Sequence, residues 1–254
     1  MKCIISCEHA SNYIPSGFRH LFRGSDKVLT SDQAYDPGAA ELALRLAEEL
    51  QVSAHLGTIS RLLIDLNRSP SNRKSLYTVY SRKLAPDDRE LFLQKYYQPY
   101  RDKVERLVAG QIVRGMPILH LSVHSFTPVK NGKVRRADIG LLYDPAHPVE
   151  KNICAFLATL LQQKVKSLQV RKNYPYLGKT DGFASFLRRK YPAKLYAGIE
   201  IELNQALLVS GETTYRQMTG VLVEGIRCMV RQDDFSTIAA IRTAGRKADG
   251  YLCR

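Results

Sequence analysis

The stretch Pro117-Ile118-Leu119-His120-Leu121-Ser122-Val123-His124-Ser125 alternates between apolar and polar side chains. A period of two predicts a β-strand over 117–123 with its apolar face buried. On a helix, His120 and His124 would face the same way and could share one metal ion. On a strand they lie about 13 Å apart, at about 3.3 Å per residue, whereas Zn–N bonds measure about 2.0–2.1 Å. We therefore expect His124, at the strand exit, to be a candidate ligand and His120 to be packed or hydrogen-bonded.

Other short apolar runs alternate along the chain with amphipathic helical patterns. The runs that predict strands are 3–7, 60–66, 139–143, 168–171 and 197–203, and the patterns that predict helices are 39–50, 86–109, 149–161 and 213–230. Asp36-Pro37-Gly38 supplies an N-cap candidate and a first-turn proline to the helix at residue 39. The alternation favours an α/β architecture. Because no shift in composition divides the sequence, we expect one domain over residues 1–254, with a loosely ordered tail at 243–254.

Length and composition limit the class of protein. The chain has 254 residues, of which 44% are hydrophobic, which is enough for one sizeable domain. No stretch approaches the roughly 20 apolar residues of a membrane span. Residues 1–9 lack the long apolar region and the small-residue cleavage site of a signal peptide. We therefore expect a cytoplasmic protein with no membrane association.

The net charge of +14 allows several explanations. Basic clusters lie at 130–136, 188–190 and 242–247. None is interleaved with aromatic side chains as in a stacking platform for bases, and no recognised nucleic-acid-binding motif is present. The sequence therefore favours a solvated basic surface first and attraction of an acidic substrate second, ahead of nucleic-acid binding.

The run Ser60-Arg61-Leu62-Leu63-Ile64-Asp65-Leu66-Asn67-Arg68 combines a predicted buried strand with charged side chains. Ionised side chains are expensive to bury unless they are paired or bind something. Arginine and asparagine side chains delivered by one strand and its exit suit a small anion, most simply a carboxylate. The residues of this predicted anion site are Arg61, Asn67 and Arg68.

Polar groups also gather at the ends of other predicted strands, where sites form in open α/β sheets. Glu8 and His9 follow the first strand, and His124 ends the middle one. Glu200 and Glu202 share a face of the late strand, and Glu202 is the preferred functional residue because it lies closer to the carboxyl end. Glu200 could instead be a structural partner of an arginine. Two histidines plus one carboxylate are the parts of a zinc site with water in the fourth position.

Motifs of other catalytic classes are not found. The chain has no G-x-S-x-G elbow, no G-x-G-x-x-G and no P-loop. Its five cysteines are scattered without a C-x-x-C pair, so a cysteine zinc site lacks support. Cys3 and Cys7 are expected to be small buried apolar residues of the first strand.

The chain resembles the N-formylglutamate amidohydrolase family in segments that keep the family's order from residue 3 to about 208. The segments are Cys7-Glu8-His9-Ala10-Ser11-Asn12-Tyr13-Ile14-Pro15, Asp36-Pro37-Gly38-Ala39, Ser60 to Arg68, Val123-His124-Ser125 and Ile201-Glu202-Leu203-Asn204-Gln205. The Asp-Leu-Asn-Arg segment and the histidine after the middle strand also resemble the broader zinc carboxypeptidase and aspartoacylase group.

The resemblance implies a zinc-exopeptidase-like fold: a mixed, mostly parallel sheet with helices on both faces. It also implies zinc-dependent hydrolysis of an amide next to a carboxylate, with N-formyl-L-glutamate giving formate and glutamate. By this resemblance, His9 and His124 match the zinc-binding histidines and Glu202 matches the general acid/base. The residues that match the group binding the substrate carboxylate and polarising the carbonyl are Arg61, Asn67 and Arg68.

One position departs from the pattern of zinc carboxypeptidases. They use H-x-x-E at the first site, and the glutamate position is occupied here by Asn12. The carboxylate ligand must therefore come from elsewhere. Glu8 would need a bend in the loop, because neighbours on a strand point opposite ways. Asp36, at a helix start, is the other candidate.

Two alternatives to a formylglutamate hydrolase stay open on the sequence alone. The first is a related amidohydrolase or carboxypeptidase acting on another N-acyl amino acid or a peptide end. The second is a non-catalytic anion- or nucleic-acid-binding protein on the same fold. Metal content separates the enzymes from the binding protein, whose affinity for nucleic acid would fall steeply with salt.

Overall fold

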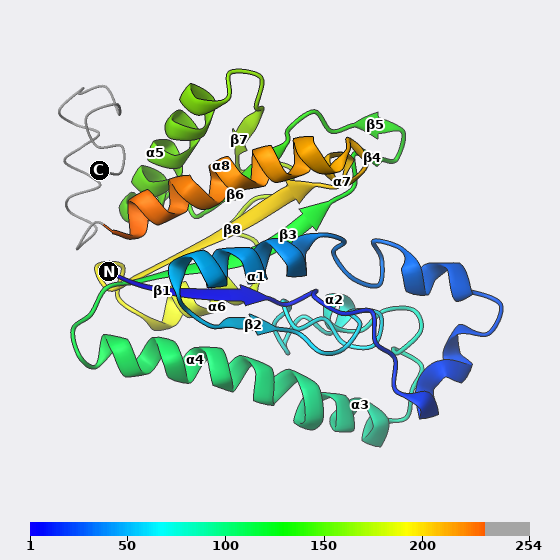
Figure 1. Ribbon diagram of the computed structural model, residues 1–254. Coiled ribbons are helices and arrows are strands. Elements are labelled where there is room, and N and C mark those ends of the chain that lie inside the picture. Colours follow the sequence, from blue (N-terminus) through cyan, green and yellow to red (C-terminus); the bar gives the residue numbers. More distant parts are fainter. Residues whose placement is uncertain (232–254) are drawn as a thin grey trace.

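Figure 1 shows the computed structural model, which describes residues 1–231 as an α/β fold around one central mixed sheet. The strands of the central sheet are β1 (Lys2–Cys7), β2 (Ala54–Leu56), β3 (Ile118–Phe126), β6 (Ile139–Leu142), β7 (Val170–Lys172) and β8 (Tyr196–Asn204). Their spatial order is β2-β1-β3-β8-β6-β7. The first four in that order are parallel, and β6 pairs antiparallel with β8 and parallel with β7. The predicted α/β architecture with a mixed, mostly parallel sheet is confirmed.

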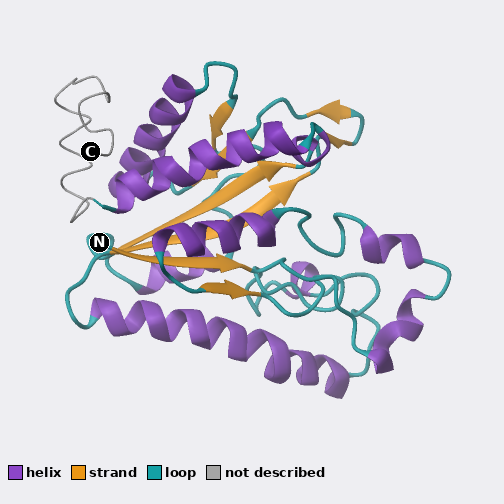
Figure 2. Cartoon of the chain, viewed as in Figure 1, coloured by secondary structure: helices purple, strands orange, loops and turns teal. Residues whose placement is uncertain are grey.

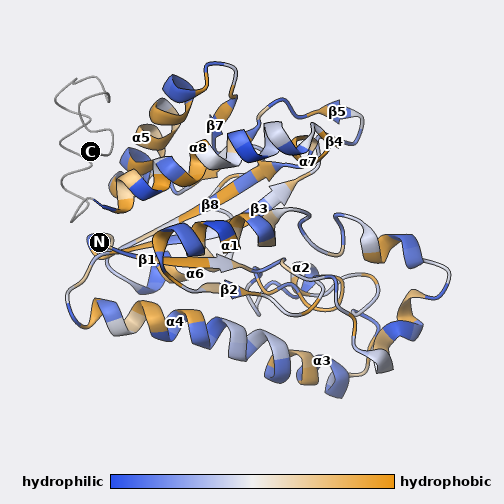
Figure 3. Cartoon of the chain, in the orientation of Figure 1, coloured by the Kyte–Doolittle hydropathy of each residue, from blue (hydrophilic) through white to orange (hydrophobic). Residues whose placement is uncertain are grey.

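Helices cover both faces of the sheet, as expected (Figures 1 and 2). On one face lie α1 (Ala39–Leu50), α5 (Pro148–Lys164) and α8 (Glu212–Val230), and on the other lie α4 (Gln98–Ile112) and α6 (Phe183–Lys190). The first face contains the larger core, because alternate side chains of β1, β3 and β8 are apolar and pack under these helices. Figure 3 shows the resulting hydrophobic colouring along β8 and the mixed colouring of α5 and α8.

The predicted helix at 86–109 is present and longer than expected. It consists of α3 (Pro86–Phe92), a π-helical turn at Leu93–Tyr97, and α4, which ends at Ile112. Pro99 does not end the helix: the turn directly before it is π-helical, and the N–H of Gln98 donates to the carbonyl of Leu93.

The predicted strand at 60–66 is wrong. This segment forms turns, in which Leu63 N–H donates to the carbonyl of Ser60 and Asp65 N–H donates to that of Leu76. Its apolar side chains are nevertheless buried, in a second core that does not involve the sheet. That core is shared with the 3-10 helices Ser16–Phe22 and Asp26–Thr30. An apolar run indicates burial, but its pairing depends on neighbours that the local pattern does not show.

Some elements were not predicted from the sequence. They are β2, the hairpin of β4 (Val129–Lys130) and β5 (Lys133–Val134), α2 (Arg73–Leu76), α6 and α7 (Ala206–Val209). Among the helices of residues 1–231, none is both long and apolar enough to cross a membrane. The tail at 243–254 lies outside the described residues, so its predicted loose order stays a prediction.

Candidate metal centre and active site

The site lies at the carboxyl ends of the parallel strands, on the sheet face that α4 and α6 cover. In the register of β3 and β8, His124 lies beside Glu202 and Ser122 lies beside Glu200. Side chains at paired positions of neighbouring strands point to the same side of a sheet. The period-two alternation of both strands therefore places His124, Glu200 and Glu202 on one face, and all three line one pocket.

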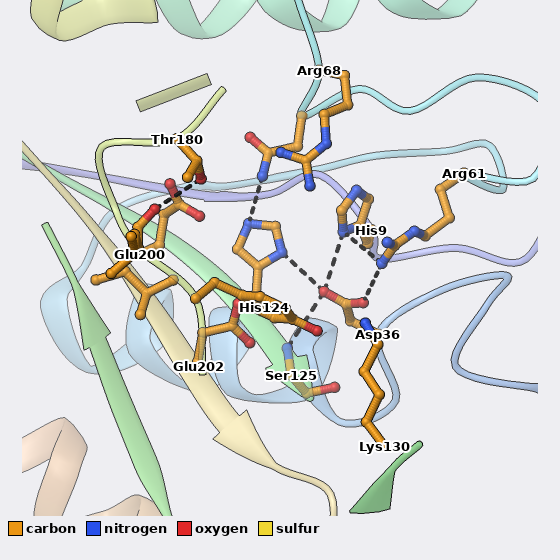
Figure 4. Close-up of a pocket in the computed structure, with 14 residues that line it drawn as sticks. His9, Asp36, Arg61, Arg68, His124, Ser125, Lys130, Thr180, Glu200 and Glu202 are labelled. Atoms are coloured by element: carbon orange, nitrogen blue, oxygen red, sulfur yellow. Dashed lines mark hydrogen bonds and ion pairs between the residues drawn. The ribbon is translucent and has the colours of Figure 1, made fainter. Parts of the chain in front are cut away.

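His9, Asp36 and His124 form the centre of the site (Figure 4). One potential ligand atom from each lies within 4.8 Å of those from the other two. Asp36 Oδ2 is 3.2 Å from Nδ1 of His9 and 2.9 Å from Nδ1 of His124. All three side chains are at least 96% buried. His9 follows the end of β1, as the sequence predicted, whereas His124 lies inside β3, which continues two residues further to Phe126.

A tight turn before α1 brings Asp36 to the histidines. The backbone N–H of Asp36 donates to the carbonyl of His9 at 2.9 Å, and Ala39 N–H donates to the carbonyl of Asp36 at 3.1 Å. Gly38 has a φ of 77°, which glycine adopts without the strain of other residues. Asp36 thus reaches the site through this turn and makes no N-cap hydrogen bond to α1.

Glu8 lies on the other side of His124 from Asp36. Its Oε2 is 3.2 Å from Nε2 of that ring. Glu8 is therefore not one of the three residues whose ligand atoms cluster, which are His9, Asp36 and His124. Asp65 has the same relation to His9, with Oδ1 at 2.7 Å from Nε2. Each histidine therefore lies between Asp36 and a second buried carboxylate. Asp65 was part of the charged run singled out in the sequence but was given no role there.

The charges of this cluster are mutually stabilising. Burial alone would raise the pKa of Asp36, but the charges and hydrogen bonds of His9, His124 and Arg61 outweigh it and hold the pKa well below its usual range. Burial also opposes ionisation of Glu8 and Asp65. The contact with His124 nevertheless lowers the pKa of Glu8, and the contact with His9 lowers that of Asp65. Burial would lower the pKa of both histidines, but the neighbouring carboxylates raise it. The carboxylates are therefore ionised and able to bind a cation.

Glu202 has a different environment from these carboxylates. It is buried, lines the same pocket, and its Oε2 atom has no hydrogen-bond partner. Burial, with the charges of Asp36 and Glu200, raises the pKa of Glu202 to about 7 against the opposing effect of His124. Burial also raises the pKa of Glu200, which lines the pocket without an ion pair among the described residues. A carboxyl group that titrates near neutral pH is suited to general acid–base catalysis.

Arg61, Asn67 and Arg68 all line this pocket, although they come from turns and not from the predicted strand. Arg61 Nη1 donates to Asp36 Oδ1 at 3.0 Å. Asn67 Oδ1 accepts from the N–H of Phe183 at 2.7 Å, which leaves its amide nitrogen facing His124. Arg68 donates to the carbonyl of Asp181.

The pocket has a volume of about 270 Å³, and sequence reasoning missed part of its lining. The additional residues are Ser125, Lys130, Leu142, Tyr176, Leu177 and Thr180. Lys130 belongs to the β4–β5 hairpin and points towards Asp36 in Figure 4. It was seen in the sequence only as part of a basic cluster, and no local pattern marked it as a pocket residue.

The donor set fits zinc. Two imidazole nitrogens and one carboxylate oxygen are a ligand combination of catalytic zinc sites. The remaining nitrogen of each ring lies beside a carboxylate, Asp65 at 2.7 Å from His9 and Glu8 at 3.2 Å from His124, as is usual for metal-bound histidines. The residues that would hold the ion are His9, Asp36 and His124.

The fold is α/β, and its pocket contains a histidine–carboxylate cluster beside Glu202, a buried glutamate with a pKa of about 7. These features indicate a hydrolase. The family model of N-formylglutamate amidohydrolase matches residues 1–209, and the chain belongs to this family. Membership supports a hydrolase that acts on amide bonds.

Solved structures resemble the whole fold. Gene product Atu2144 from Agrobacterium tumefaciens is 27% identical, with a TM-score of 0.75 over 95% of this chain and 92% of that one. N-formylglutamate amidohydrolase from Ralstonia eutropha JMP134 is 16% identical, with a TM-score of 0.67 over 96% of this chain and 95% of that one. At that identity the second likeness shows the fold alone. No curated protein matches the chain.

Proposed function

We propose that the chain is a zinc-dependent amidohydrolase that cleaves the amide of an N-acyl amino acid such as N-formyl-L-glutamate. The observation that carries the proposal is the histidine–aspartate–histidine cluster in one pocket with the unpartnered carboxyl oxygen of Glu202. The family model of N-formylglutamate amidohydrolase, which matches residues 1–209, supports the choice of substrate.

The chemistry combines a metal ion with the proton chemistry of Glu202. When bound, zinc supplies Lewis acidity that lowers the pKa of water towards about 7 and polarises a carbonyl oxygen. Glu202 takes the proton of the attacking water and later delivers it to the leaving amine nitrogen. Its raised pKa suits both steps, because the carboxyl group must gain and lose a proton at neutral pH.

Cationic side chains orient the substrate. Arg68 and the amide of Asn67 bind the carboxylate next to the scissile amide, which fixes the bond relative to the cluster. Arg61 stabilises negative charge that develops on the carbonyl oxygen. Lys130 is available for a second carboxylate, as in the side chain of a glutamate substrate.

The test is an activity screen of the zinc-loaded full chain against N-formyl, N-acetyl and N-succinyl amino acids. We expect Glu202→Gln to abolish turnover and to retain zinc, because the side chain keeps its shape but cannot accept the proton. We expect His9→Ala and His124→Ala to lose the metal itself. Measured zinc content per chain separates the two effects. Turnover by Glu202→Gln at the wild-type rate would refute its role, and hydrolysis of none of the compounds would refute the proposed reaction.

A further inference from the structure

We propose that a second pocket, beside the histidine–aspartate–histidine cluster, is the subsite for the acyl group of the substrate, and that it takes an acyl group bearing an amine, as in a dipeptide. The proposal rests on the amide hydrolysis of the proposed function and names the acyl half of its substrate. Formyl is the smallest acyl group and carries only a hydrogen atom beyond its carbonyl carbon. The second pocket provides room and polar partners for a longer one.

The second pocket lies against the first and has a volume of about 190 Å³. The two pockets share the side chains of Asp36, Arg61, Ser125, Lys130 and Tyr176. A water molecule takes up about 30 Å³ in the liquid, so the second pocket has room for about six water-sized groups. Because Asp36 belongs to the cluster, the border between the two pockets lies where the scissile bond is proposed to bind.

The two halves of a substrate extend into different pockets. Asn67 and Arg68, which bind the carboxylate in the proposed function, line the first pocket and not the second. Arg61, which stabilises the carbonyl oxygen, lines both. Figure 4 shows Arg68 and Lys130 on opposite sides of Asp36. With the amino-acid carboxylate at Arg68 and the carbonyl oxygen at Arg61, the chain beyond the carbonyl carbon leads away from Arg68 and towards the second pocket.

Two hydrogen-bond acceptors line the part of the second pocket that the first does not share. Gln205 Nε2 donates to Ser125 Oγ at 3.1 Å, and Ser125 Oγ donates to the carbonyl of Pro37 at 2.7 Å. The amide nitrogen of Gln205 is thus engaged, and its amide oxygen is left to accept. Asp32 is exposed, and its carboxylate forms no ion pair within residues 1–231. Because both oxygens can only accept, the complementary group on a ligand is a donor, most strongly an ammonium group.

The competing class is an acyl group that ends in a carboxylate, because two cationic side chains also line the second pocket. Arg61 is already paired with Asp36, with Nη1 at 3.0 Å from Oδ1. Lys130 lies on the border with the first pocket, where it is available for the side-chain carboxylate of a glutamate substrate. The unshared part of the pocket has one charged side chain, which is that of Asp32. The charges there favour a cationic acyl group over an anionic one.

Hydrolysis of a dipeptide requires no reactant other than water. Water adds across the amide C–N bond, so that its oxygen joins the acyl carbon and its protons balance the new carboxyl group and the leaving amine. The products are two free amino acids. The same groups that act on a formyl amide in the proposed function perform this reaction.

The experiment measures kcat/KM of the zinc-loaded full chain for two isosteric pairs of substrates. Glycyl-L-glutamate differs from N-propionyl-L-glutamate by an ammonium group in place of a methyl group. The pair of β-alanyl-L-glutamate and N-butyryl-L-glutamate differs in the same way and is one methylene longer. We expect the amine-bearing compound of at least one pair to be preferred about tenfold, the equivalent of one hydrogen bond to a charged group. We also expect it to be hydrolysed faster than N-formyl-L-glutamate.

Asp32→Asn tests the carboxylate of the subsite. We expect it to reduce the preference within the pair by about two- to fivefold, as for an exposed ion pair. Asp26→Asn is the matched control and should keep the preference, because Asp26 is also exposed but lines neither pocket. Calorimetric titration of Glu202→Gln with the same pairs compares their dissociation constants without turnover. An unchanged preference in Asp32→Asn would overturn the role of this carboxylate.

The outcomes separate this proposal from the proposed function. Equal kcat/KM within both pairs would overturn the acyl subsite. Faster hydrolysis of N-formyl-L-glutamate or N-succinyl-L-glutamate than of both amine-bearing compounds would overturn it as well. In each case, hydrolysis of N-formyl-L-glutamate would leave the proposed function standing. Hydrolysis of none of the compounds would refute both.

Discussion

The cationic side chains in the pocket differ in the partners that they contact within the protein. Arg61 is paired with Asp36, and Arg68 donates to a backbone carbonyl. Lys130 forms no ion pair within residues 1–231, and its Nζ lies 5.4 Å from the centroid of the Tyr176 ring. A cation without a carboxylate partner is free to bind an anionic group of a substrate.

Lys130→Met should therefore change substrate preference more than catalysis. We expect KM for N-formyl-glutamate to rise by about tenfold, the equivalent of one hydrogen bond to a charged group. KM for N-formyl-leucine, which has no second carboxylate, should change little. Lys133→Met is the matched control, because Lys133 pairs with Lys130 in the hairpin but does not line the pocket. Steady-state kinetics with both substrates tests this, and equal effects on both would contradict it.

At the scale of elements, the turn that leads into α1 connects the fold to the chemistry. It joins the exit of β1 to Asp36 through backbone hydrogen bonds, and it needs the left-handed backbone of Gly38. A Cβ at Gly38 would also lie 2.6 Å from Leu208 Cδ2, so α7 restrains the same turn. A small change in this element should therefore move Asp36.

Gly38→Ala should reduce stability and metal affinity together. The left-handed backbone costs a residue with a Cβ about 1–2 kcal/mol, and the side chain of Leu208 must also shift. Gly115→Ala is the control, because Gly115 has a φ of 70° but no atom within 4 Å of the added Cβ. We expect urea unfolding to show a loss of stability in both variants, and zinc binding to weaken only in Gly38→Ala. Unchanged zinc affinity in Gly38→Ala would show that the turn does not control the position of Asp36 in the metal site.

At the scale of the whole molecule, stability should depend on a histidine outside the active-site cluster. His120 lies inside the protein between Ser6 Oγ and the hydroxyl of Tyr196, each at 2.8 Å. The predicted packed, hydrogen-bonded histidine is confirmed. Burial lowers the pKa of His120 from 6.5 to about 4, so the folded state keeps this ring neutral.

The effect on unfolding follows from proton binding. Between pH 6.5 and about pH 4 the unfolded chain binds a proton on His120 that the folded state excludes. The contribution of neutral His120 to the free energy of unfolding is therefore fully present above pH 6.5 and falls as the pH drops. The loss is up to about 3 kcal/mol, because each unit of pKa difference corresponds to 1.36 kcal/mol. Urea unfolding at several pH values should show a smaller loss for His120→Gln than for the wild type. Equal pH dependence would contradict the assignment, since the other titrating groups are common to both proteins.

Much of the fold followed from local patterns. Alternation in β3 and β8 and the amphipathic pattern of α1 identified these elements from the sequence, because their buried faces repeat at the period of the backbone. The run at 60–66 failed because burial without alternation does not specify pairing. The hairpin β4–β5 was missed because its strands are exposed and only two residues long, too short for a period of two to be seen.

The candidate site, like the fold, could be predicted from the sequence only in part. The sequence by itself determined that His9, His124 and Glu202 stand at strand ends, since periodicity fixes both the face and the end of a strand at which a side chain lies. Only the tertiary structure decided that Asp36 meets both histidines while Glu8 and Asp65 lie behind them. Asp36 and Asp65 are 27 and 56 residues from His9 along the chain. Contacts over such separations are set by the packing of turns against the sheet, which no local repeat in the sequence records.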